Sequence, residues 1–408
     1  MNILFLTLSD INDINHRGIY TDLIRVLDER EVNTYVVSPR QKRENLPTKL
    51  IKQNNTNILK VKTGNITQTT SFIEKGISTL MIEYQYLNAI RKYFKNVHFD
   101  MIMYSTPPIT FNKIIKYYKK NHNSKSYLIL KDIFPQNAVD IGLMKKNSVL
   151  HKVFRKKEIN LYKQSDVIGC MSSGNMNYIL NHNDYIDKRR VEIFPNAIDP
   201  IDLNKISKPN KNILNKYNVP KDNTLFIYGG NLGKPQGVDY ILKIVNNFHK
   251  VKNGHLLIIG SGTEFNKIDD YIKDTKPKNV SIYSKLSKAE YDELVRCADV
   301  GLIFLDNRFT IPNFPSRLTS YMENSLPVLA ATDTNTDLRE VLNESKSGFW
   351  CESKDADPFI KYAKELTEDS ELRKVMGNNG RKYLEKNYNI AYTVDTLLKH
   401  LNGDEINV

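Results

Sequence analysis

Residues 311–330, IPNFPSRLTSYMENSLPVLA, combine side chains that could bind an anion. The pattern predicts a polar loop, a helix with Pro315 in its first turn and a buried strand, because proline has a fixed φ and no donor N–H. Ser316 and the amides up to Leu318 would then surround a helix N-terminus, which favours an anion. Arg317 adds a guanidinium that can hold two phosphate oxygens. An ordinary capped helix would explain the same residues.

Two glycine-rich turns precede this stretch. The first, YGGNLGKPQG at residues 228–237, lies between a predicted strand and a predicted helix, and the second, GSG at residues 260–262, follows the next strand. Glycines there let the backbone approach a phosphate closely, although such turns also occur simply to save space. The first turn is neither GxGxxG nor a Walker A motif, which argues against ATP hydrolysis. The candidate binding residues in the turns are Gly230, Asn231, Lys234, Gln236, Gly260 and Gly262.

All three stretches follow predicted strands of one domain. In open α/β sheets, ligands bind at the carboxyl ends of parallel strands. The sequence therefore predicts a nucleotide-diphosphate pocket in the C-terminal half of the chain.

The elements that would position these residues alternate between strand and helix along the whole chain. Short apolar runs such as residues 3–8 and 126–130 predict buried strands, and residues 18–30, 72–94, 109–121 and 149–163 predict helices between strands. The pattern restarts at residue 225, after a connection at residues 194–200. We therefore expect an α/β protein with two Rossmann-like domains, each a parallel doubly wound sheet, facing one another across a cleft. The expected domains are residues 1–198 and 199–386, with a helix at 387–408 that packs back towards the N-terminal domain.

Composition limits the class of protein. The chain has 408 residues, of which 40% are apolar and 26% charged, as expected for a globular protein with two cores. No window approaches the roughly 20 apolar residues of a membrane-spanning helix, and the N-terminus does not resemble a signal peptide. The three cysteines are widely spaced, which fits a reduced cytoplasm and argues against a disulfide framework or a zinc site. Asp355 and Asp357 form a DxD that is typical of a helix cap, so no metal is expected.

Positive charge is concentrated in the N-terminal half. Residues 1–200 hold 30 Lys and Arg against 18 Asp and Glu, and residues 201–408 hold 29 against 28. Residues 111–163 alone hold 13 basic and 3 acidic side chains. A lysine-rich composition can arise without function, but this distribution favours an anionic partner, either a membrane surface or a phosphate-bearing lipid. Nucleic acid is not the expected partner, because no recognition motif is present.

The motifs together resemble those of family 4 glycosyltransferases of the GT-B fold, over nearly the full chain. The segments IYGGN, GSG, CADVGLIFL, PSRLTSYMENSLPVLA, SGFW and MGNNGRKYLEKNYN follow the order of that family. KDIFPQNAVDIG at residues 131–142 resembles a bacterial subgroup that adds N-acetylfucosamine-type sugars during capsule or O-antigen assembly. The resemblance implies a retaining transferase with a UDP-sugar donor, no further cofactor and a polyprenyl-diphosphate-linked acceptor.

The chain departs from the family at several positions that the resemblance brings into comparison. Two family glutamates correspond to Pro312 and Ser320, and the family's Arg and Lys after the first strand of the C-terminal domain correspond to Asn231 and Gln236. The resemblance therefore leaves Lys234 and Arg317 as the cations for the diphosphate, and Arg317 as a catalytic candidate.

In the N-terminal domain, a frequent His-Asp pair of the family corresponds to Lys131 and Asp132. The resemblance implies that Asp132 orients the acceptor hydroxyl, whereas a helix-cap aspartate is the alternative. Arg17 and Gly18 match the family's glycine loop, which implies contact with the acceptor or the donor pyrophosphate. His16 is a candidate base, but a loop histidine is more often only solvated.

These expectations give a glycosyltransferase at the inner face of the cell membrane, held peripherally and in a salt-sensitive manner because neither basic helix shows a large apolar face. The alternatives are a non-catalytic scaffold of a polysaccharide-assembly complex, since both glutamates are absent, and a nucleotide-sugar 2-epimerase. The sequence does not predict an oligomeric state.

Overall fold

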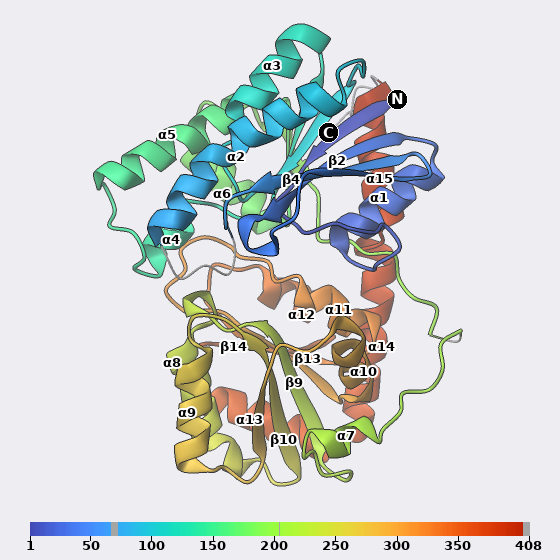
Figure 1. The fold of residues 1–408 in the computed structure, drawn as a ribbon. Coiled ribbons are helices and arrows are strands. Elements are labelled where there is room, and N and C mark those ends of the chain that lie inside the picture. Colours follow the sequence, from blue (N-terminus) through green and yellow to red (C-terminus); the bar gives the residue numbers. More distant parts are fainter. Residues whose placement is uncertain (67–71, 204, 403–408) are drawn as a thin grey trace. The chain divides into compact units, whose positions relative to one another are not determined.

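The computed structural model describes residues 1–66, 72–203 and 205–402. The chain forms two compact units (Figure 1). Unit 1 comprises Met1–Asp199 together with the chain from Asn389 onwards, and unit 2 comprises Pro200–Tyr388. These limits lie within two residues of the expected ones, and each unit has its own hydrophobic core.

Unit 1 is built on one sheet with the strand order β3-β4-β2-β1-β5-β6-β7-β8. Its central strands are continuous apolar runs because both faces of a parallel sheet are covered by helices; in β1, for example, Ile3, Leu4 and Phe5 are fully buried. The strands are β1 (Asn2–Leu6), β2 (Asn33–Gln41), β3 (Lys49–Gln53), β4 (Thr56–Thr63), β5 (Met101–Ser105), β6 (Lys125–Leu130), β7 (Val167–Cys170) and β8 (Val191–Ile193).

One edge of this sheet differs from the predicted all-parallel arrangement. β3 pairs with β4 in an antiparallel hairpin, and the two strands are joined at Asn54, which has a positive φ of 46°. Asparagine tolerates this left-handed conformation. β3 carries a lysine near each end of a five-residue run, so its apolar signal is too short to be recognised in the sequence.

Seven helices of the described chain belong to unit 1: α1 (Ile19–Glu29), α2 (Phe72–Tyr93), α3 (Asn112–His122), α4 (Gln136–Asp140), α5 (Val149–Gln164), α6 (Ser173–His182) and α15 (Ile390–Asn402). The last of these closes one side of the core. Val394 and Leu397 of α15 are fully buried and pack with Leu27 of α1 in the core beside β1. Its first residue is anchored by main-chain bonding, since Ile390 N donates to Ile198 O over 2.8 Å.

Unit 2 contains a parallel sheet with the order β11-β10-β9-β12-β13-β14. Its strands are β9 (Thr224–Asn231), β10 (Gly254–Ser261), β11 (Val280–Ser284), β12 (Val300–Phe304), β13 (Val328–Thr332) and β14 (Gly348–Glu352). Its helices are α7 (Ile213–Lys216), α8 (Val238–Asn247), α9 (Phe265–Thr275), α10 (Lys288–Cys297), α11 (Arg317–Glu323), α12 (Leu338–Ser345), α13 (Ala356–Glu368) and α14 (Ser370–Asn387), with a short 3-10 helix at Lys234–Gln236. The sequence did not predict α12 or β14, which is half-exposed along most of its length.

Candidate active site

The two glycine turns of unit 2 lie side by side at the carboxyl edge of its sheet. β9 and β10 are neighbours, and their register pairs Gly230 with Gly260 and Asn231 with Ser261. The two turns therefore begin at paired positions of the neighbouring strands, next to each other at the carboxyl edge of the sheet.

The backbones of the two turns approach each other closely. A Cβ on Gly260 would lie 2.2 Å from the carbonyl oxygen of Gly230, and a Cβ on Gly262 would lie 2.3 Å from the carbonyl oxygen of Leu232. Gly230 also has a φ of 132°, which side chains rarely allow. Glycine at these positions is thus explained by packing of turn against turn, which is the space-saving interpretation of the motif.

Arg317 lies against the first of these turns. Its Nε donates to the carbonyl oxygen of Gly229, and its guanidinium lies 4.5 Å from the centre of the Tyr228 ring. A Cβ on Gly230 would come within 2.4 Å of Nη2 of Arg317. Residues that are 88 positions apart in the chain are therefore brought together, as the sequence predicted for a common edge.

The helix that carries Arg317 begins later than predicted. α11 starts at Arg317, so Pro315 precedes the helix instead of lying in its first turn. The reason is local bonding: Leu318 N donates to Pro315 O over 3.3 Å, which forms a turn ahead of the helix. Ser316 is the N-cap and is exposed, but its side chain makes no capping bond, and Leu318 is buried in the core.

Asn231 and Gln236 bind each other. Nδ2 of Asn231 donates to Oε1 of Gln236 over 2.8 Å, and the same oxygen accepts from Gly233 N over 3.1 Å. This bonding holds the turn closed. Lys234 lies between them in the 3-10 helix and is exposed.

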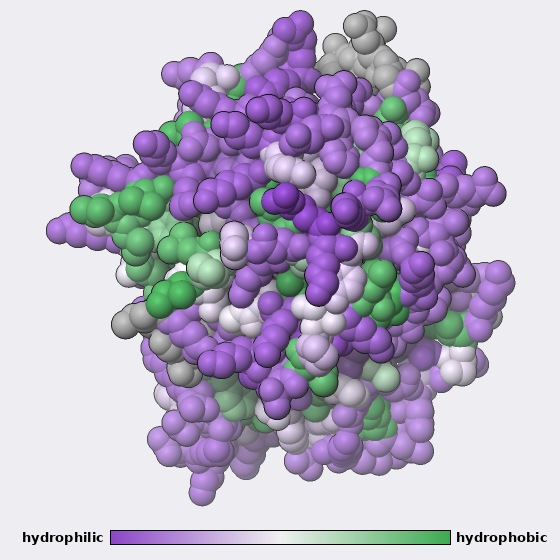
Figure 2. Space-filling model, turned by 45° about the horizontal axis from the view of Figure 1, so that its top comes forward, coloured by the Kyte–Doolittle hydropathy of each residue, from purple (hydrophilic) through white to green (hydrophobic). Residues whose placement is uncertain are grey.

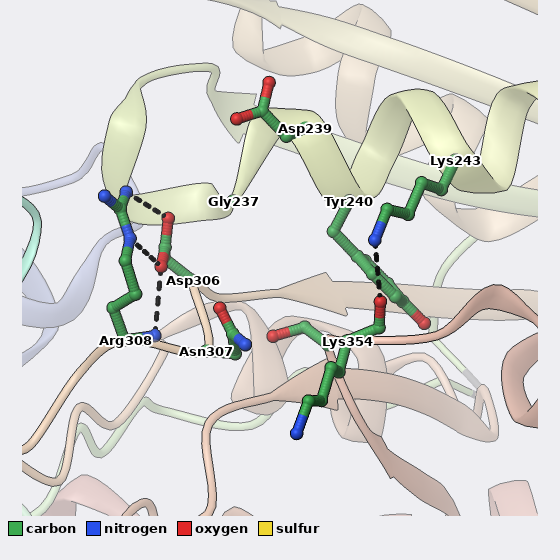
Figure 3. A pocket seen from close by; sticks show the side chains of 9 residues that line it. Gly237, Asp239, Tyr240, Lys243, Asp306, Asn307, Arg308 and Lys354 are labelled. Atoms are coloured by element: carbon green, nitrogen blue, oxygen red, sulfur yellow. Dashed lines mark hydrogen bonds and ion pairs between the residues drawn. The ribbon is translucent and has the colours of Figure 1, made fainter.

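A cavity of about 310 Å³ lies at the start of α8, and the sequence did not predict it. Figure 3 shows its charged lining, in which Nη2 of Arg308 pairs with Oδ2 of Asp306 over 2.7 Å and Nζ of Lys243 donates to the carbonyl oxygen of Lys354 over 3.0 Å. The carboxyl-edge argument could have located it, because Asp306 follows β12 and Gly237 ends the first glycine turn.

In unit 1, Lys131 and Asp132 follow β6 directly, and each binds a different asparagine. Nζ of Lys131 donates to Oδ1 of Asn196 over 2.7 Å, and burial lowers the pKa of Lys131 to about 7. Oδ1 of Asp132 accepts from Nδ2 of Asn137 over 2.5 Å. Burial raises the pKa of Asp132 to about 6, and the bond from Asn137 opposes that rise.

The geometry around Asp132 does not match the alternative of a helix cap. The next helix, α4, has Pro135 at its N-cap. The main-chain amides of Lys131 and Asp132 instead donate to Oγ1 of Thr106, at 3.0 and 3.2 Å. Thr106, Asn137 and Asn196 were missed by sequence reasoning, because polar residues in loops, or in a five-residue helix such as α4, carry no periodic signal.

The glycine loop of unit 1 places Arg17 and Gly18 at the start of α1. Nη2 of Arg17 donates to the carbonyl oxygen of Asp199 over 2.6 Å. Gly18 is the exposed N-cap, and its φ of 169° is an extended conformation that any residue can adopt. His16 is exposed beside them. The backbone therefore gives no reason of its own for glycine at position 18.

Within the described residues, His, Cys, Asp and Glu side chains form no group of three or more that could hold a metal ion. Asp355 occupies the N-cap position of α13, although its side chain makes no capping bond.

The part of unit 2 that contains the two glycine turns and Arg317 resembles a known protein family. Residues 209–383, which cover most of unit 2, match the protein-family model for glycosyl transferases group 1. Unit 2 is thus similar to the domain that this family model describes. The predicted enzyme class, a glycosyltransferase, is thereby confirmed.

Individual relatives extend over more of the chain. A probable glycosyltransferase, WbjE of Pseudomonas aeruginosa, is 22% identical over 295 residues, which is 71% of each chain. The structure of sucrose-phosphate synthase from Thermosynechococcus elongatus has a TM-score of 0.75 at 14% identity, covering 98% of this chain and 99% of that one. Anabaena Alr3699/HepE in complex with UDP has a TM-score of 0.66 at 13% identity, covering 99% of this chain and 100% of that one. The predicted GT-B fold of two Rossmann-like units is therefore confirmed, whereas the cleft between the units stays a prediction.

Proposed function

We propose that this glycosyltransferase moves a sugar, of the N-acetylfucosamine type, from a UDP-sugar to a polyprenyl-diphosphate-linked acceptor with retention of configuration. The pathway would be capsular polysaccharide or O-antigen assembly. The observation that carries the donor part is the position of Arg317, a cation against the glycine turn of a group 1 glycosyltransferase domain. The UDP complex of a protein with the same fold supports the choice of nucleotide.

The proposed role of Arg317 follows from the charge that develops in the reaction. As the glycosidic bond to the diphosphate breaks, negative charge builds on the leaving oxygens, and fixed donors in place before the reaction stabilise it. Arg317 is held by Gly229 and Tyr228, so its guanidinium is already oriented. Lys234, exposed in the 3-10 helix within the first glycine turn, would supply a second cation.

Asp132 is proposed to orient the acceptor hydroxyl. With its pKa raised to about 6, the carboxyl is largely ionised at neutral pH and can accept a hydrogen bond from the attacking hydroxyl. Asn137 holds the carboxylate of Asp132 in place by donating a hydrogen bond to its Oδ1 atom.

Peripheral attachment to an anionic membrane is proposed from the basic residues at 111–163. In the described part of the chain, the structure contains no helix whose length and apolar character would allow it to cross a bilayer.

The donor assignment is tested with Arg317→Ala. Loss of a charged hydrogen bond to the diphosphate should lower kcat/KM about 10- to 100-fold in slow hydrolysis of UDP-sugars and should weaken UDP binding measured by calorimetry. Arg373→Ala is the matched control, since Arg373 also donates to main-chain carbonyls of unit 2 but lies on α14. Unchanged hydrolysis in Arg317→Ala, or binding of none of a panel of UDP- and GDP-sugars by the wild type, contradicts the proposal. Normal partner binding without turnover would instead favour a scaffold.

A further inference from the structure

The start of α5 exposes apolar side chains to solvent. Val149 is 81% exposed and Leu150 is 55% exposed, and Val153 one turn later is also exposed. Leu143, in the segment before the helix, is exposed as well. Isolated apolar residues on a surface need no explanation, but four gathered in and ahead of the first turns of one helix form a patch.

Helix α2 carries a second exposed apolar row. Ile77, Leu80, Met81 and Tyr84 are exposed and follow the spacing i, i+3, i+4, i+7, which places them on one helical face. The opposite face of α2 is already buried through Ile82 and Tyr86. The exposed row therefore has no partner in the described core of unit 1.

These two sets lie on the same side of unit 1. The amide of Lys113, in the first turn of α3, donates to Oε1 of Glu83 on α2, and Lys157 of α5 is close enough to affect the pKa of that carboxyl. Nδ2 of Asn112 donates to the carbonyl oxygen of Lys157 over 3.5 Å. Figure 2 shows the resulting green area at the left of the view, over the start of α5 and the first half of α2, bordered by purple.

Exposed lysines flank the apolar residues of α5 in the sequence. The exposed cations nearest in sequence are Lys145, Lys146, Lys152 and Lys156. Together they and the eight apolar residues define the apolar-basic face, which comprises Ile77, Leu80, Met81, Tyr84, Leu143, Lys145, Lys146, Val149, Leu150, Lys152, Val153 and Lys156.

The positive charge of the apolar-basic face favours an anionic binding partner over a second copy of the same chain. A second copy related by two-fold symmetry would place lysines against lysines, which opposes association. An anionic lipid surface satisfies both components, because its headgroups pair with the lysines and its acyl boundary accepts the apolar side chains.

We propose that the apolar-basic face inserts into the headgroup region of an anionic bilayer, with Val149 and Leu150 penetrating furthest. This proposal adds residues and a mode of attachment to the proposed function. Only the biological role of the insertion, access to a lipid-linked acceptor, rests on that function. The two basic helices, α3 and α5, still show no large apolar face, because the exposed apolar side chains lie only at the start of α5 and on α2. Attachment then has a salt-resistant apolar component in addition to the salt-sensitive one.

The first test is co-sedimentation with vesicles of phosphatidylglycerol and phosphatidylcholine at low and high salt. The variant Val149→Ser/Leu150→Ser/Val153→Ser should keep binding at about 0.1 M salt but lose about tenfold in binding at about 1 M, where charge attraction is screened. Val375→Ser/Tyr392→Ser is the matched control, because both side chains are exposed apolar residues elsewhere on the chain. Equal high-salt binding by the triple variant and the wild type, or none by the wild type, overturns the proposal.

The second test measures depth. Trp350 is the single tryptophan and lies on β14 of unit 2, so it reports the background signal. In Leu150→Trp, brominated lipids should quench fluorescence well beyond the quenching seen in the wild type. Quenching no greater than in the wild type overturns insertion.

Activity separates this inference from the function it rests on. The triple variant should retain wild-type hydrolysis of the UDP-sugar in the absence of lipid, since none of its residues touches the candidate site. If wild type and variant both lack hydrolysis but differ in vesicle binding, the proposed function fails and the insertion stands. If sedimentation velocity without lipid shows a dimer that the triple variant abolishes, the face is a self-association surface and the insertion is wrong.

Discussion

Asp132 and Lys131 are neighbours in the chain whose pKa values move in opposite directions for the same reason. Burial disfavours the charged form of each, which raises the pKa of the acid to about 6 and lowers that of the base to about 7. The carboxylate of Asp132 accepts a hydrogen bond from the Asn137 side chain, and the ammonium of Lys131 donates one to the Asn196 side chain. Both therefore change charge close to neutral pH.

The ionisation of Asp132 should produce an ascending limb in the pH dependence of kcat/KM for sugar transfer. If the ionised carboxyl orients the acceptor, kcat/KM should rise as the pH passes through about 6, where Asp132 loses its proton. Asp132→Asn should lower the plateau and remove that limb. A variant profile with the wild-type limb would assign the ionisation to another group.

The same shift predicts the direction of a change in stability. The folded state holds the Asp132 proton more tightly than the unfolded state, so the free energy of unfolding should fall as the pH rises from about 4 to about 6. The loss is up to about 3 kcal/mol for a shift of roughly two units. Urea unfolding of wild type and Asp132→Asn across this range measures it, and parallel curves for the two proteins would contradict it.

At this scale the sequence predicted part of the site. Arg317 and the glycines could be selected because their types and positions after strands carry a physical meaning. The partners Asn137 and Asn196 could not, because an asparagine in a short helix or in a loop is compatible with a turn, a cap or a buried bond. Pro315 was expected in the first turn of α11 but lies two residues before the helix, because the sequence does not specify the turn that precedes it.

At the scale of the elements, the packing of the β9 and β10 turns is the most sensitive feature. Gly260→Ala should destabilise unit 2 by about 1–3 kcal/mol, because the new Cβ meets the main chain of Gly230 and not a movable side chain. Gly76→Ala is the control, since that glycine lies within α2 and an added Cβ would meet nothing within 4 Å. Alanine there should raise stability by about 0.5–1 kcal/mol. Chemical unfolding followed by Trp350 fluorescence measures the stability of Gly260→Ala. Chemical unfolding followed by circular dichroism measures the stability of Gly76→Ala. A neutral Gly260→Ala would mean that the two turns separate easily.

Most elements were predictable where apolar runs were long, as in β1 and β6. β3 and β14 were not predicted, because short edge strands bury too few side chains to leave a pattern. α12 was also missed although Leu338, Leu342 and Ser345 are buried at helical spacing, because eight residues are too few for that period to be recognised.

At the scale of the whole molecule, unit 1 is completed by the end of the chain. Val394 and Leu397 of α15 are fully buried in its core, and each such side chain stabilises by about 1.5–3 kcal/mol. A chain that ends at Tyr388 should therefore lose cooperative folding of unit 1 but keep unit 2. Circular dichroism should show the lost transition, whereas the unfolding midpoint reported by Trp350 should stay the same. A shift of both signals together would show that the two units fold as one.

The bridge between Ile198 and Asn389 has a consequence for how such a protein can be diversified. The chain leaves unit 1 and returns to it at adjacent positions, so unit 2 is inserted in the sequence of unit 1 between two neighbouring residues. Exchanging Pro200–Tyr388 for the corresponding segment of another glycosyltransferase would interrupt no strand of the eight-stranded sheet. Under the proposed function, recombination at these positions would give a new donor preference to an unchanged acceptor-binding unit.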